Sequence, residues 1–123
     1  METKSNVVFM GTPGVGKTHL AISIGIEAAT QRLSTYFINF STLTVKIKKT
    51  IAEKREETII KHYFKYSLLI IDEIGYLPID KETSYVFFQL IAARYEKRST
   101  ILTTNQLFLN GEMYLAITLL LLQ

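Results

Sequence analysis

The stretch GTPGVGKT at residues 11–18 constrains the fold of this 123-residue chain more than any other feature. Its spacing, Gly-x-x-x-x-Gly-Lys-Thr, is typical of a phosphate-binding loop when a strand precedes it and a helix follows it. Here the apolar run NVVFM lies before the loop at 6–10, and the segment KTHLAISIGIEAA follows from residue 17. The sequence therefore predicts a strand, a phosphate-binding loop and a helix, in that order. The alternative is a glycine-rich turn that matches the pattern by chance.

The residue types in this loop suit an anion. Glycines let the backbone approach a phosphate without a Cβ in the way. The Lys17 ammonium can reach the terminal phosphates of a nucleotide, and the Thr18 hydroxyl can bind Mg²⁺. The predicted nucleotide contacts are Gly11, Thr12, Pro13, Gly14, Val15, Gly16, Lys17, Thr18 and the adjoining His19.

Three further runs are short and rich in apolar and β-branched residues, and they predict buried parallel strands at 35–40, 67–72 and 99–104. Longer segments with helical features lie at 17–31, 42–65 and 80–97. Asp80 is the expected N-cap of the last of these helices. Because strand and helix alternate, the sequence predicts a three-layer α/β fold with a parallel sheet. The segment LAITLLLLQ near the end is compatible with either a helix or a strand.

Polar side chains end two of the predicted strands. LLIIDE at 68–73 finishes in two carboxylates, of which we expect Asp72 to hold Mg²⁺ and Glu73 to polarise an attacking water. ILTTN finishes in Asn105, whose amide can hydrogen-bond a phosphate oxygen and the water. The predicted catalytic residues are Glu73, Asn105 and Lys17, and the predicted metal ligands are Thr18 and Asp72. The alternatives are an ordinary acidic strand end and, for Asn105, a cap or turn.

The composition favours one folded domain over residues 1–123. Hydrophobic residues make up 48% of the chain and charged residues 20%, the balance of an ordinary globular protein. The chain has no cysteine, which excludes disulfides and thiolate metal sites and fits a cytoplasmic location. The longest apolar stretch, LAITLLLL, is far shorter than the ~20 residues that span a bilayer, so we expect no membrane contact.

Positive charge is concentrated at 46–65, which contains seven Lys or Arg against three Glu. On a helix over 42–65, apolar side chains can face the sheet while basic ones meet solvent or the phosphates of DNA. The expected sheet-facing residues are Val45, Ile47, Ile51, Ile59, Ile60, Tyr63 and Phe64. The predicted sequence-independent DNA contacts are Lys46, Lys48, Lys49, Lys54 and Arg55. The alternative is a solvated face with Lys–Glu pairs.

Histidine offers no metal site in this sequence. Neither His19 nor His62 has a second metal-type ligand three or four residues further along, so we expect both to be structural or exposed to solvent.

Together, GTPGVGKT, LLIIDE and the strand ending TTN resemble the Walker A, Walker B and sensor 1 motifs of the AAA+ ATPases, a family of P-loop NTPases. The sequence that surrounds these motifs resembles the IstB-like helper ATPases of bacterial insertion-sequence transposition, in the stretches GKTHLAISIGIEA, IIDEIGYLPID and FFQLIAARYEKRSTILTTN. These helper ATPases are relatives of the DnaC-type helicase loaders. The resemblance runs from about Asn6 to about Phe108. It implies Walker A at 11–18, Walker B at 68–73 and sensor 1 at Asn105, on a strand between the two Walker strands.

The same resemblance implies ATP or ADP with Mg²⁺ as cofactors. It also implies DNA, a transposase or a helicase, and further copies of the protein as partners. The functions that follow are ATP-dependent assembly on DNA that assists the selection of a transposition target, or helicase loading in replication. A nucleotide-binding remnant without turnover is the third possibility.

The sequence departs from the family after Asn105. The family continues with an arginine that acts on a neighbouring subunit's nucleotide, a fifth strand and a lid, whereas residues 106–123 diverge and no Lys or Arg follows Arg98. We therefore expect an incomplete AAA+ core whose first strand lies at an open edge, which LAITLLLL would have to cover. We also expect slow ATP hydrolysis, because such an arginine is worth ~10³ to 10⁵ in rate in comparable enzymes.

Overall fold

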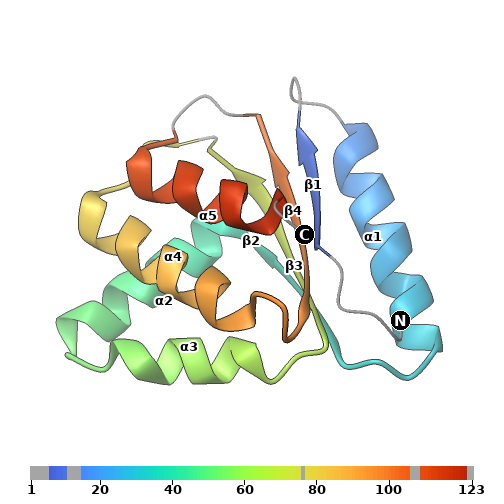
Figure 1. Cartoon of the computed structure of the whole chain (residues 1–123), viewed down its shortest axis with the longest axis horizontal. Coiled ribbons are helices and arrows are strands. Elements are labelled where there is room, and N and C mark those ends of the chain that lie inside the picture. Colours follow the sequence, from blue (N-terminus) through green and yellow to red (C-terminus); the bar gives the residue numbers. More distant parts are fainter. Residues whose placement is uncertain (1–5, 11–14, 76, 106–108, 122–123) are drawn as a thin grey trace.

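The computed structural model describes residues 6–10, 15–75, 77–105 and 109–121 (Figure 1). Within them the chain forms a four-stranded parallel sheet and five helices. The strands are β1 (Asn6–Met10), β2 (Thr35–Asn39), β3 (Leu68–Ile74) and β4 (Ser99–Thr104). The helices are α1 (Val15–Thr30), α2 (Phe40–Ala52), α3 (Glu56–Phe64), α4 (Lys81–Arg94) and α5 (Gly111–Leu121).

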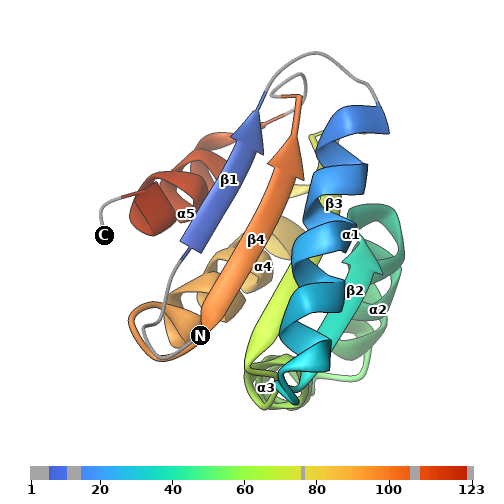
Figure 2. The same cartoon turned by 90° about the vertical axis from the view of Figure 1, so that its right-hand side faces the viewer.

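The strand order is β1-β4-β3-β2, with all neighbours parallel. The strand that ends before Asn105 therefore lies between β1 and β3, as the resemblance implies (Figure 2). The α/β fold with a parallel sheet is confirmed. Because all four strands run the same way, their carboxyl ends meet at one edge of the sheet, which is where such folds bind ligands.

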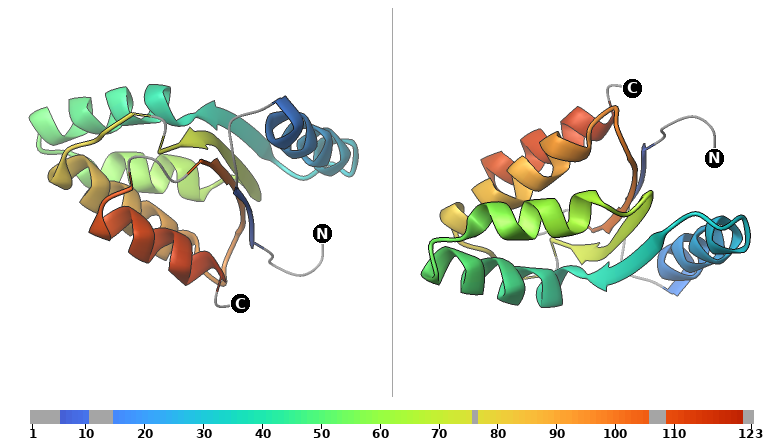
Figure 3. Two further views of the ribbon diagram at one scale, coloured as in Figure 1. Left: turned by 90° about the horizontal axis from the view of Figure 1, so that it is seen from above. Right: turned by 90° about the horizontal axis from the view of Figure 1, so that it is seen from below.

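The described helices cover the two faces of the sheet unequally. Helix α1 lies on one face, whereas α2, α3, α4 and α5 gather on the other (Figures 1 and 3). The larger core lies under these four helices and contains Leu43, Ile71, Phe87 and Leu102, all fully buried. The central strands β3 and β4 are buried almost throughout, whereas most residues of the edge strands β1 and β2 are only partly buried.

Helix α4 begins where the sequence predicts. The Asp80 carboxylate accepts a hydrogen bond from the Thr83 backbone N–H at 3.1 Å, which satisfies a free donor of the first turn. The helix ends at Arg94, three residues earlier than expected, because Tyr95 leaves the helical region with a ψ of 130°.

The single helix expected over 42–65 is wrong, because the chain forms α2 and α3 with a turn between them. Lys54 has a φ of 55°, which a continuing helix does not allow. The Lys54 N–H bonds to the Ile51 carbonyl at 3.0 Å and the Arg55 N–H to the Thr50 carbonyl at 2.8 Å. These two bonds form a Schellman motif, which ends helices and is more common with glycine at the left-handed position.

The apolar faces of these two helices are largely as expected, with Ile47, Ile59 and Tyr63 buried. Val45 is the exception, since 68% of its surface is exposed. It lies two residues from both Leu43 and Ile47, which are buried, and two residues along a helix correspond to a turn of about 200°. Val45 therefore points away from the sheet.

Residues 115–121 of the segment LAITLLLL belong to helix α5, which packs against β1 and α4 without pairing with β1 as a strand. Its buried residues Met113, Ala116, Ile117 and Leu120 join the core beside α4, on the face of the sheet. Among the described strands β1 therefore stays at the edge, paired only with β4. No helix in the described ranges combines the length and the apolar character needed to cross a membrane.

Candidate functional site

Part of the predicted phosphate loop lies outside the described residues. This applies to Gly11, Thr12, Pro13 and Gly14, and the side chain of Val15 is not described either. The structure does describe the end of the loop, where α1 begins. Gly16, Lys17 and Thr18 lie in the first turn of this helix, whose free N–H groups favour an anion.

Thr18 and Asp72 meet at the carboxyl edge of the sheet. The Thr18 hydroxyl lies 3.1 Å from both carboxylate oxygens of Asp72, although the two residues are 54 positions apart in the chain. Asp72 is only 3% exposed and also accepts a hydrogen bond from the Thr103 hydroxyl of β4. Two hydroxyl donors therefore satisfy a buried carboxylate, and the two predicted metal ligands lie in contact.

These residues fit Mg²⁺ bound together with a nucleotide. Magnesium in such sites takes only one or two protein oxygens and completes its shell with water and phosphate oxygens. Within the described part of the chain no group of three or more His, Cys, Asp or Glu side chains could hold a metal by itself. One hydroxyl and one carboxylate beside the helix N-terminus are the donor set expected for Mg²⁺ that arrives with phosphates.

Lys17 reaches across to the end of β4. Its ammonium donates to the Thr104 backbone carbonyl at 3.1 Å. Thr104 pairs with Met10 of β1 and with Ile74 of β3, so the ammonium lies where three strands end. If the phosphates of a nucleotide bind at the N-terminus of α1, a cation at this point can contact the terminal ones.

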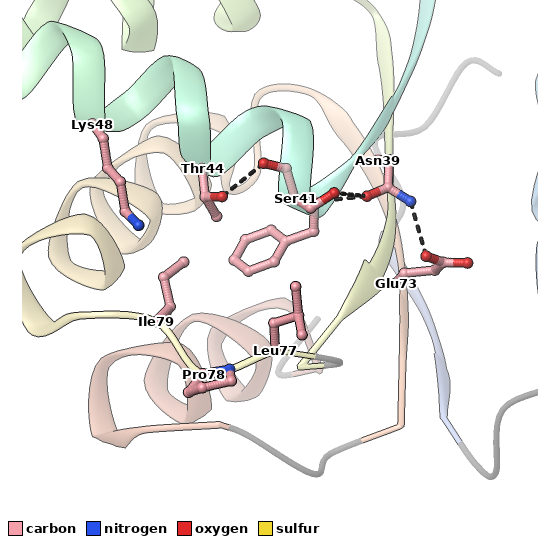
Figure 4. Close-up of a pocket in the computed structure, with 9 residues that line it drawn as sticks. Asn39, Ser41, Thr44, Lys48, Glu73, Leu77, Pro78 and Ile79 are labelled. Carbon is pink, nitrogen blue, oxygen red and sulfur yellow. Dashed lines mark hydrogen bonds between the residues drawn. The ribbon is translucent and has the colours of Figure 1, made fainter.

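Glu73 is turned outward by an irregularity in the sheet. The register of β3 against β4 shifts between Ile71 and Ile74, and Glu73 has a φ of 64°. The shift is a β-bulge, a feature that re-aims a side chain where it occurs. The Glu73 carboxylate is exposed and accepts a hydrogen bond from the Asn39 side-chain amide at 3.0 Å (Figure 4).

Asn39 is a site residue that sequence reasoning missed. Its side-chain oxygen caps α2 by accepting from the Ser41 backbone N–H at 2.9 Å, while its amide holds Glu73. The predicted strand at 35–40 and helix from 42 conceal this role, because α2 begins at Phe40 and makes Asn39 its N-cap. The contact with Glu73 leaves no signal in the sequence either, because it depends on the bulge in the neighbouring strand.

A cavity of about 180 Å³ lies beside Glu73. The start of α2 forms one wall and the segment Leu77–Ile79 forms the other (Figure 4). Thr44 and Lys48 line it on the α2 side, about one and two helical turns beyond Phe40, the first residue of α2. Lys48 therefore faces the surroundings of Glu73.

Asn105 follows β4 and is half-buried. It lies against Gly75, where an added Cβ would be 3.5 Å from the Asn105 side-chain oxygen and 3.2 Å from the Thr104 hydroxyl. Gly75 has a φ of 86°, which favours glycine for a second reason. The structure thus brings Asn105 to the end of β3, the strand that carries Asp72 and Glu73.

The two histidines take no part in this arrangement of Thr18, Asp72 and Glu73. Both His19 and His62 are exposed. The pKa of His62 is lowered by partial burial and by the nearby charges of Lys65 and Lys46.

The predicted DNA contacts are all exposed but do not form one surface. Lys46, Lys49 and Arg55 line a groove between α2 and α3 that also includes His62. Lys48 lies at the cavity beside Glu73 instead, because positions 46 and 49 share one face of the helix and position 48 lies on another. Lys54 is in the turn between the two helices.

Comparison with known proteins identifies the family. The sequence profile described as IstB-like ATP binding protein matches residues 1–118. The chain belongs to the IstB-like ATP-binding proteins. A relative from Bacillus thuringiensis subsp. berliner, named for ATP binding in the insertion sequence IS232, is 63% identical over 105 residues. This match covers 85% of the IstB-like chain and 42% of the relative.

More distant relatives include helicase loaders. The replicative helicase loader DnaC of Escherichia coli (strain K12) is 31% identical over 104 residues, which cover 82% of this IstB-like chain and 42% of DnaC. A crystal structure of the DnaC helicase loader superposes with a TM-score of 0.72 at 26% identity, over 94% of the chain and 66% of that structure. The chain therefore has the fold of these P-loop NTPase domains and spans less than half the length of the two relatives compared by sequence.

Proposed function

We propose that this IstB-like chain binds ATP with Mg²⁺ at the carboxyl edge of its sheet. Residues 11–18 hold the phosphates, Lys17 contacts the terminal ones, and Thr18 and Asp72 hold the metal. The observation that carries this proposal is the contact of the Thr18 hydroxyl with both oxygens of the buried Asp72. A chance glycine-rich turn gives no reason for a helix N-terminus to meet a buried acid from a distant strand.

The remaining residues at this edge suit hydrolysis. When bound, Mg²⁺ supplies positive charge that stabilises the phosphates and their leaving group. The Glu73 carboxylate can accept a proton from an attacking water, and the Asn39 amide holds it in one orientation at 3.0 Å. Asn105 can hydrogen-bond a phosphate oxygen from the adjoining strand end.

For this chain measured alone we expect ATP to bind but its hydrolysis to be slow. Its residues 99–123 contain no Lys or Arg that could act on the nucleotide of a neighbouring subunit. Comparing the rate of ATP hydrolysis with the affinity for ATP separates a slow ATPase from a remnant that only binds.

We propose that the biological role of this IstB-like protein is ATP-dependent assembly on DNA, which assists the selection of a transposition target. The insertion-sequence relative at 63% identity favours this role over helicase loading, for which the named relative is 31% identical. Copies of the protein and a transposase are the partners this role requires.

The groove between α2 and α3 is the proposed DNA contact. Lys46, Lys49 and Arg55 place three positive charges along it, with Glu53 as the acidic residue among its lining. Contacts of this kind bind phosphates without reading the bases and weaken as salt rises.

Charge reversal tests the DNA contact. We expect Lys48→Glu combined with Lys49→Glu to weaken binding of a DNA duplex at low salt while leaving ATP affinity intact, as measured by fluorescence anisotropy. The single variants locate the effect: Lys49→Glu accounts for most of the loss if the groove is the contact, because Lys48 faces the cavity beside Glu73. Equal DNA binding by the double variant and the parent contradicts the proposed surface.

A further inference from the structure

Thr103 of β4 connects two residues of the proposed site through one hydroxyl group. The residue is 1% exposed, and its hydroxyl donates to Asp72 Oδ1. The same oxygen accepts the backbone N–H of Glu73 at 2.8 Å. A hydroxyl has one proton to donate, and here it points to the Asp72 carboxylate. The oxygen lone pairs are left to accept the backbone N–H of Glu73.

This hydroxyl lies at the β-bulge. The pairing of β3 with β4 runs in register from Leu68 to Ile71 and resumes at Ile74 with Thr104, so Asp72 and Glu73 together stand opposite Thr103. In a regular ladder the N–H of a strand residue bonds to a backbone carbonyl of its neighbour. At Glu73 the Thr103 side chain takes the place of that carbonyl and closes the bulge.

Both bonds matter for orientation. Asp72 Oδ1 accepts from Thr18 and from Thr103, while Oδ2 accepts from Thr18. A donor on the β4 side fixes the rotation of the carboxylate about its Cβ–Cγ bond. The bond from Glu73 N holds a backbone whose φ of 64° is uncommon for a residue with a side chain.

We propose that Thr103 is a positioning residue that fixes both the proposed metal ligand Asp72 and the proposed base Glu73. The inference rests on the proposed function, because it assigns Asp72 to Mg²⁺. Because Thr103 is buried, the proposal gives it no direct contact with nucleotide or metal. It acts as outer partners of metal ligands do, whose replacement typically lowers metal affinity 10- to 100-fold.

Strand β4 allows a test with matched substitutions at Thr103 and at a control threonine. Thr103→Val keeps the shape of the side chain and removes the hydroxyl, whereas Thr103→Ser keeps the hydroxyl. Thr100→Val is the control, since Thr100 is also fully buried on β4 but its hydroxyl accepts from Arg94, at the other end of the strand. Thr103→Ala replaces Thr103→Val if thermal melting shows that the valine variant does not fold.

Two readouts separate positioning from general destabilisation. The first is the affinity for a fluorescent ATP analogue, measured once with Mg²⁺ and once with EDTA. The ratio of the two affinities gives the gain in affinity that the metal provides. The second is the exchange rate of the Glu73 backbone amide with solvent deuterium, measured by NMR. We expect Thr103→Val to weaken the apparent Mg²⁺ affinity about tenfold or more, to leave affinity in EDTA unchanged and to speed Glu73 exchange. Thr103→Ser and Thr100→Val should keep the metal effect.

The possible outcomes are distinct. If the parent chain binds nucleotide without any gain from Mg²⁺, the proposed metal site is wrong. If the parent shows the gain and folded Thr103→Val keeps both the gain and the slow Glu73 exchange, the role of Thr103 is wrong and the proposed function stands. If Thr100→Val loses the metal effect as much as Thr103→Val, the loss comes from destabilisation of β4, which also overturns the inference.

Discussion

Arg94 should be among the most costly side chains to replace in this chain. It is fully buried at the end of α4. Its guanidinium donates to the carbonyls of Tyr63 at 2.7 Å, Tyr66 at 2.9 Å and Ser99 at 2.6 Å, and to the Thr100 hydroxyl at 3.0 Å. These bonds join the end of α3 and the chain after it to the beginning of β4.

Arg94→Met removes these donors and keeps most of the side-chain volume. Three carbonyls then lose a donor, those of Tyr63 and Ser99 buried and that of Tyr66 partly buried, at about 1 to 3 kcal/mol each. The variant also removes a charge whose burial lowers the pKa of Arg94 from 12.5 to about 10, the result mainly of desolvation and then of repulsion by Arg98. That shift corresponds to about 3 kcal/mol recovered on removal of the charge. Taking about 2 kcal/mol for each of the three carbonyls, we expect a net loss of roughly 3 kcal/mol.

Urea denaturation followed by circular dichroism measures this loss. With a slope of about 2 kcal/mol per molar urea, the midpoint should fall by about 1.5 M. Arg98→Met is the matched control, because Arg98 is half-buried and donates to the Phe64 carbonyl at the same end of the sheet. Its loss should stay near 1 kcal/mol. A loss below 1 kcal/mol for Arg94→Met would refute the reasoning that these bonds outweigh the cost of burying the charge.

Two further predictions concern stability near the site. Asn39→Ala should lower the free energy of unfolding by about 1 kcal/mol through loss of the α2 cap, whereas Asn39→Ser keeps a capping oxygen and should lose less, as thermal melts will show. Equal losses for the two variants would argue against the cap. Gly75→Ala should cost about 1 kcal/mol or more because of its φ of 86°, while Gly111→Ala, where a Cβ meets no atom within 4 Å, should cost nothing. The reverse order would contradict the conformation at Gly75.

Local patterns were enough to predict the α/β fold and the elements that carry the site. The phosphate loop fixed the first strand and helix, and the apolar runs that end in Asp72 and Asn105 fixed two more strands. The order of the strands followed from the resemblance. Asp72 meets Thr18 because the carboxyl ends of parallel strands share one edge, beside the start of α1.

What could not be predicted depends on contacts between distant segments. The break between α2 and α3 has a lysine, Lys54, in the left-handed position, so no glycine or asparagine marks it. The outward turn of Glu73 comes from a bulge against β4, and the role of Asn39 follows from that bulge. Thr103 is one threonine among several in an apolar strand, where threonine is common without any special role. Only the pairing of β3 with β4 singles it out.

Calorimetric titration with ATP in the presence of Mg²⁺ tests the central claim most directly. We predict saturable binding of one ATP per chain, weakened about 10- to 100-fold in Lys17→Ala by loss of a charged hydrogen-bond donor. Asp72→Asn should lose the gain that Mg²⁺ gives the parent, with both variants folded by circular dichroism. No saturable binding by the parent, or undiminished binding by Lys17→Ala, would contradict the assignment of this edge of the sheet as a nucleotide site.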